Sequence, residues 1–212
     1  MSDPANLLNK VYTSTLNSYT MVFFSKNPWF GLVLLMVSFF DVYAGAAGLL
    51  SLLTANAFAW GLGLNRQSIL SGFYGFNPLL TGLGLGLSFQ PGPELYLLLV
   101  ATALAALFIT LAFEGFLSKY ALPYLTLPFL LSLWIATLAA RNYSTMIPGE
   151  SGIYTMNTIY ERGGPFIVRI YEWFGDVSWP LFIKTYFKSL GAIFFQYHLF
   201  AGLLIADRKS VV

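Results

Sequence analysis

Apolar segments, separated by single charged residues or by glycine and proline, occupy most of this 212-residue chain. Five follow one another, at residues 29–40, 42–64, 69–89, 95–113 and 122–140. A helix needs ~20 apolar residues to cross a bilayer. Charged residues make up 9% of the chain, whereas an ordinary soluble domain carries about 25%. The pattern therefore predicts an all-α integral membrane protein embedded in a lipid bilayer.

The composition also excludes several kinds of chemistry. The chain has no cysteine, which removes disulfides, thiolate nucleophiles and cysteine-based metal sites together. His198 is the one histidine, too few for a histidine-based metal site. A net charge of +2 does not indicate the strongly basic surface that nucleic-acid-binding proteins carry. We expect no enzyme, no cofactor or metal and no nucleic-acid partner, but a membrane protein that moves a solute.

Two stretches break a helix inside an apolar segment: GFYGFNP at 72–78 and LPYLTLPF at 122–129. A proline removes a backbone donor, and freed polar groups inside a membrane must be satisfied by protein or by a water-filled cavity. Interrupted spans of this kind mark solute sites in transporters. A helix that is only kinked, with Gly72 and Gly75 at a close contact with a neighbouring helix, would show the same sequence pattern. The residues alone leave both interpretations open.

The order and spacing of these motifs resemble the urea transporter family. GFYGFN is followed about fifty residues later by LPYLTLPF, and SKNPWFG precedes both at 25–31. The resemblance covers roughly 17–140 and implies one half of an inverted-repeat channel fold: five transmembrane helices plus a half-spanning pore helix, here at 18–25. It also implies a pore between the two repeats and a homotrimer. Five spans are an odd number, so a following repeat would enter with opposite topology.

The resemblance further implies the residues that line the pore. Phe24, Phe76 and Leu80 match positions along a narrow slot, and Thr126 matches its mid-pore threonine. Met21 stands where the family often has a glutamine or glutamate. The implied function is passive, channel-type transport of urea. The apolar Met21 keeps another small neutral solute open as an alternative, such as a short amide, ammonia or water, and so is a non-transporting membrane anchor.

The remainder of the chain differs in composition. We expect residues 1–140 to form the first membrane repeat, 141–178 an extramembrane connector with a short helix near 166–174, and 179–206 the beginning of a second repeat. In that register Phe195 matches Phe24, Ala192 matches Met21, and His198, which we interpret as structural, stands where the family often has asparagine. The ending DRKSVV (207–212) can be written back as DNA that resembles a sequencing adapter. We therefore expect a non-native tail and a fragment of a longer protein.

The charges between the apolar segments predict the orientation. Arg66 and Lys119 follow the second and fourth segments, whereas Asp41 and Glu94 follow the first and third. Basic residues near span ends favour the cytoplasm. We therefore expect a multi-pass protein of the inner (plasma) membrane with a cytoplasmic N-terminus. Glu114 lies near the cytoplasmic end of its segment, and we interpret it as interfacial.

This orientation can be tested with cysteines, because the chain has none of its own. In intact cells, we expect an impermeant thiol reagent to label Glu94→Cys from the outside and to leave Arg66→Cys unlabelled until the membrane is opened. Labelling of position 66 from the outside would contradict the orientation.

Overall fold

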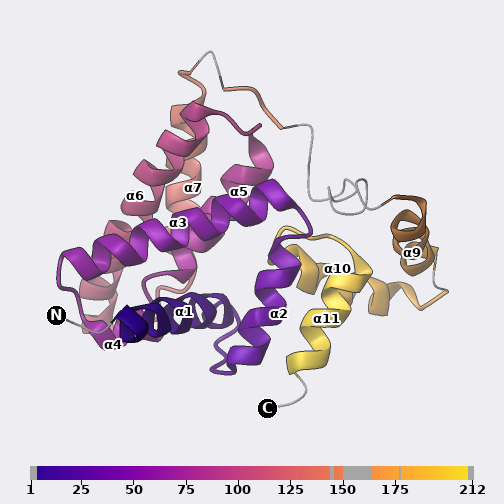
Figure 1. The fold of residues 1–212 in the computed structure, drawn as a ribbon, viewed down its shortest axis with the longest axis horizontal. Helices are drawn as coiled ribbons and strands as arrows, with labels where there is room; N and C mark the ends of the chain where they lie inside the picture. The colour runs from indigo at the N-terminus through magenta and orange to yellow at the C-terminus, as the bar shows by residue number, and fades with distance from the viewer. Residues whose placement is uncertain (1–3, 144–145, 150–163, 177, 210–212) are drawn as a thin grey trace.

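The computed structural model describes residues 4–143, 146–149, 164–176 and 178–209, and this part of the chain is helical (Figure 1). It contains a single isolated β-bridge, between Phe89 and Pro148, and no strand. The all-α prediction is therefore confirmed for these residues. In chain order the elements are α1 (Pro4–Met21), α2 (Pro28–Ser38), α3 (Val42–Gly61), α4 (Arg66–Leu70), α5 (Phe76–Ser88), α6 (Pro93–Leu117), the 3₁₀ helix η1 (Ser118–Tyr120), α7 (Leu127–Ala140), α9 (Gly164–Asp176), α10 (Leu181–Ala192) and α11 (Leu199–Lys209).

Local chemistry explains where several of these helices begin. The Asn27 side chain accepts a hydrogen bond from the Trp29 amide at 3.0 Å, just ahead of α2. The Asp41 carboxylate accepts a hydrogen bond from the Ala44 amide at 3.2 Å, just ahead of α3. Such side chains satisfy amides that the first turn leaves without a partner. α2, α6 and α7 also carry a proline in their first two positions, where its missing N–H costs nothing.

The structure does not confirm the expected number of spanning helices. Among the described residues, two stretches are long and apolar enough to cross a membrane, Val42–Gly61 and Pro93–Tyr120. Helices α2 and α7 are apolar but shorter, and α5 has only 13 residues. The two broken motifs explain the shortening of α5 and α7, which begin only at Phe76 and Leu127. The count of five spanning helices is therefore not confirmed.

The first helix also differs from the expectation. α1 runs over Pro4–Met21, so most of it precedes the apolar stretch 18–25 that was expected to form a half-spanning helix. The hydroxyls of Ser14 and Ser18 donate to the carbonyls of Val11 and Ser14 at 3.0 and 2.7 Å. These bonds satisfy polar side chains within the helix. The apolar stretch itself ends α1 and forms the turn that leads into α2.

Helix α5 lies at the centre of the fold, packed against α3, α6 and α7 (Figure 1). Its contact with α3 is close because glycines of α5 lie where the two helices cross. A Cβ on Gly82 would lie 2.6 Å from the carbonyl oxygen of Ala47, and one on Gly86 would lie 2.6 Å from the Ala47 Cβ. The Ser51 hydroxyl donates to the Pro78 carbonyl across the same interface at 2.7 Å. Small residues of this kind let two membrane helices approach closely.

The helix expected in the connector is present as α9, which covers 164–176 around the expected 166–174. The ring of Tyr171 on α9 stacks on His198 with the ring centroids 3.9 Å apart. The connector helix therefore docks at the start of α11.

The α3–α5 crossing predicts opposite effects for two glycine-to-alanine changes. Gly82→Ala should lower the free energy of unfolding by about 1–3 kcal/mol, because the new methyl group overlaps α3. Gly115→Ala on α6 has nothing within 4 Å of the new Cβ, and should stabilise by about 0.5–1 kcal/mol through helix propensity. Thermal unfolding of the purified chain in detergent measures both. Equal stabilisation by the two changes would contradict the close crossing.

Candidate functional site

The site begins at the turn between α1 and α2, which holds Phe24 in a left-handed backbone conformation. Phe24 has φ +55°, a region that bulky residues rarely adopt. The amides of Phe23 and Phe24 donate to the carbonyls of Thr20 and Met21 at 3.0 Å, and the Ser25 amide donates to Thr20 at 3.1 Å. These bonds fix the turn. They leave the Phe24 ring projecting, with 65% of the side chain exposed.

The same turn occurs between α10 and α11. Phe195 has φ +61°. The amides of Phe194 and Phe195 donate to Gly191 and Ala192 at 2.9 Å, and the Gln196 amide donates to Gly191 at 3.0 Å. Each of these three hydrogen bonds has a counterpart in the first turn, with the same sequence separation between donor and acceptor. The backbone therefore builds the same turn twice, but the Phe195 ring is half-buried and packs against Phe129, with the ring centroids 6.3 Å apart.

The helices that follow the two turns correspond as well. His198 Nδ1 accepts from the Phe200 amide at 3.3 Å, at the place where Asn27 accepts from Trp29 in the first turn. A glycine of each following helix packs directly on the backbone of the preceding helix. A Cβ on Gly31 would lie 2.6 Å from the carbonyl oxygen of Leu16, and a Cβ on Gly202 would overlap the carbonyl oxygen of Phe187. His198 thus caps a helix, which agrees with the structural interpretation of this residue.

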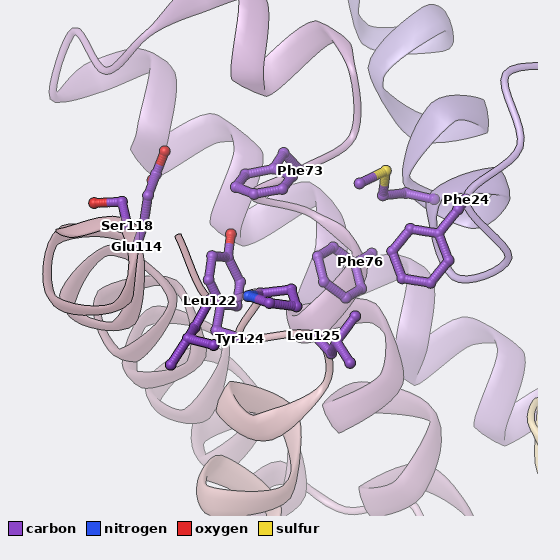
Figure 2. A pocket seen from close by; sticks show the side chains of 10 residues that line it. Phe24, Phe73, Phe76, Glu114, Ser118, Leu122, Tyr124 and Leu125 are labelled. Carbon is purple, nitrogen blue, oxygen red and sulfur yellow. The ribbon is translucent and has the colours of Figure 1, made fainter. Parts of the chain in front are cut away.

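One face of α5 runs between Phe24 and Phe195, the phenylalanines of the two turns. Phe76, Leu80 and Gly84 are spaced four residues apart, so they share a face and span ~12 Å. The ring of Phe24 lies beside Phe76 at one end (Figure 2). At the other end, Phe195 Cζ lies 3.2 Å from the position that a Cβ of Gly84 would take. Phe24, Phe76, Leu80 and Phe195, four of the predicted pore residues, therefore follow one line along α5.

A cavity of about 300 Å³ opens at the Phe24 end of this line (Figure 2). It contains three of the predicted residues, Met21, Phe24 and Phe76. Its other lining residues were not predicted to line the pore: Phe73, Glu114, Ser118, Leu122, Pro123, Tyr124 and Leu125. Four of these belong to the start of LPYLTLPF, which the sequence marks as a helix interruption. Glu114, one of two acidic residues in α6, was interpreted as interfacial.

Thr126 does not line this cavity. It stands at the start of α7, is exposed, and makes no capping hydrogen bond with its side chain. The preceding residue, Leu125, has φ +46° and turns the chain there. Its carbonyl lies 3.5 Å from the Asn77 side-chain nitrogen, which also donates to the Thr110 hydroxyl at 3.3 Å. Asn77 therefore connects α5, α6 and the loop that carries Thr126.

The polar groups near the cavity are few. Within the described part of the chain, the buried Asn77 Oδ1 and Tyr124 hydroxyl have no hydrogen-bond partner. The described residues contain no cluster of three or more metal-ligating side chains. The arrangement offers flat aromatic surfaces and isolated oxygens, which suit a small planar molecule that carries N–H groups.

A comparison with known protein families agrees with this chemistry. The family model described as urea transporter matches residues 12–207, which include both turns, α5 and the LPYLTLPF loop. Because the match covers nearly the whole chain, this protein belongs to the urea transporter family, a family of membrane proteins that transport urea.

Proposed function

We propose that urea crosses the membrane passively along the α5 face, through a narrow slot lined by aromatic rings. The observation that carries this proposal is the alignment of Phe24, Phe76, Leu80 and Phe195 along that face. The two phenylalanines at the ends belong to turns with the same hydrogen bonds. We propose that they frame the two mouths of the slot.

The chemistry of this face suits urea, which is flat, neutral and strongly dipolar. Aromatic rings can flank its plane, and a hydroxyl such as that of Thr126 can exchange hydrogen bonds with it. One hydrogen bond is worth ~1 kcal/mol net, enough to offset part of the dehydration without trapping the solute. Phe76, Leu80 and Gly84 carry no charge, so the path attracts no ion.

The proposal includes the wider architecture. Residues 1–140 supply the first repeat, 141–178 a connector, and 179–206 the start of a second, inverted repeat. The matched turns at Phe24 and Phe195 support this division. We further propose a homotrimer in the inner membrane with Arg66 and Lys119 on the cytoplasmic side. The bonds at each turn are local, so the inverted orientation rests on the family resemblance.

A second candidate function is transport of another small neutral solute. Met21 lines the cavity, and Ala192 occupies the corresponding place in the second turn. Neither side chain offers the solute a strong hydrogen bond at a mouth. Uptake of urea compared with formamide and acetamide separates the candidates. Preference for an amide would assign the protein to the alternative.

Thr126 and Thr137 provide a matched pair for testing the slot. Thr137 donates to the carbonyls of Leu133 and Trp134 at 2.9 and 3.0 Å, so its hydroxyl is used within its own helix. In the two-repeat transporter, Thr126→Val should slow urea flux several-fold, because the solute loses about one hydrogen bond, ~1 kcal/mol. Thr137→Val should leave the flux near that of the unmodified protein.

Flux is measured in liposomes at matched amounts of inserted protein. Equal slowing by the two valine variants would mean that packing, not solute contact, explains the loss. Thr126 would then have no place in the path.

A further inference from the structure

The cavity has a second end, away from Phe24, whose polar groups have no role in the proposed urea path. Glu114 from α6 and Tyr124 from the 122–125 loop lie there, beside Phe73 (Figure 2). Phe73 and Tyr124 meet edge to face, with ring centroids 5.3 Å apart. Glu114 is half-buried and forms no ion pair with any described residue. A carboxylate thus stands at an aromatic wall without a cationic partner from the described chain.

The hydroxyl of Tyr124 adds a buried polar group to this end of the cavity. Tyr124 is only 6% exposed, and its oxygen has no hydrogen-bond partner among the described residues. Figure 2 shows it directed toward the side of the cavity where Phe73 and Glu114 lie. A buried hydroxyl without a partner is costly, so a ligand that bonds it would gain that energy back.

These groups define the chemistry of the ligand. A carboxylate binds a planar guanidinium through two parallel N–H bonds, and the faces of aromatic rings attract a cation. The Tyr124 hydroxyl can accept a further N–H. Urea has the same flat shape and can also donate two N–H groups to a carboxylate, but it lacks the positive charge, so its bond to Glu114 is weaker.

We propose that the Glu114 end of the cavity is a subsite for a small guanidinium-type cation. The subsite shares the cavity with Met21, Phe24 and Phe76. In that respect the inference rests on the proposed function, because a bound cation would obstruct the mouth that urea enters. Binding at Glu114 itself does not require transport.

The test compares methylguanidinium with methylurea, its neutral counterpart of the same shape. Saturation-transfer NMR on the purified 212-residue chain in detergent reports the binding of each through its methyl protons. We expect methylguanidinium to bind more tightly than methylurea. Glu114→Gln should weaken methylguanidinium binding about tenfold, since it removes a charged hydrogen-bond partner, and should change methylurea binding much less.

Two further variants sharpen the test. Tyr124→Phe keeps the ring contact with Phe73 and removes only the hydroxyl, and should weaken methylguanidinium binding several-fold. Glu94→Gln, in the first turn of α6, removes an acidic residue outside this cavity and should have no effect. Equal weakening by Glu94→Gln and Glu114→Gln would show attraction to the overall charge and overturn the proposal. Methylguanidinium binding that neither Glu114→Gln nor Tyr124→Phe weakens would overturn it as well.

Urea flux separates this inference from the proposed function. Guanidinium at millimolar concentration should slow urea flux through the two-repeat transporter, and Glu114→Gln should relieve that inhibition. Absence of urea flux together with Glu114-dependent methylguanidinium binding would refute the urea path and leave the subsite standing. Normal flux without such binding would refute the subsite alone.

Discussion

The structure depends on satisfying the backbone where two apolar segments are interrupted. In lipid no water can bond those carbonyls and amides, so protein groups must do it. Two asparagines contribute to this. Asn17 on α1 donates to the Leu70 carbonyl at 2.7 Å, and Asn77 on α5 lies 3.5 Å from the Leu125 carbonyl. The first contact joins α1 to the end of α4, just before GFYGFNP, and the second joins α5 to the part of LPYLTLPF that lines the cavity. The interruptions and the cavity therefore share one structural cause.

The position of α5 follows from its two faces. Gly82 and Gly86 allow one face to lie directly on α3, so that helix is held without long side chains between the backbones. Phe76 and Leu80 occupy a different face, because residues two apart on a helix point in nearly opposite directions. That face meets the two turns that carry Phe24 and Phe195. The close packing of Gly82 and Gly86 on α3 therefore leaves the face with Phe76 and Leu80 turned toward Phe24 and Phe195.

Sequence reasoning anticipated features carried by local chemistry. The connector helix follows from periodicity and residue type, and the matching of Phe195 to Phe24 followed from the motif. The count of five spanning helices was not confirmed, because hydropathy does not show where an interrupted segment resumes its helix. Glu114 was not predicted to line the cavity, for a related reason. It reaches the cavity beside a loop turned by left-handed Ala121 and Leu125, which no pattern in the sequence signals.

The central claim is that solute passes along the α5 face between Phe24 and Phe195. The most direct measurement is a crystal structure of the two-repeat transporter soaked with selenourea, whose selenium is located by anomalous scattering. The account predicts selenium between the rings of Phe24 and Phe76, with further density toward Leu80. Selenium found only away from this face, for example in the cavity beside Tyr171 and His198, would contradict it.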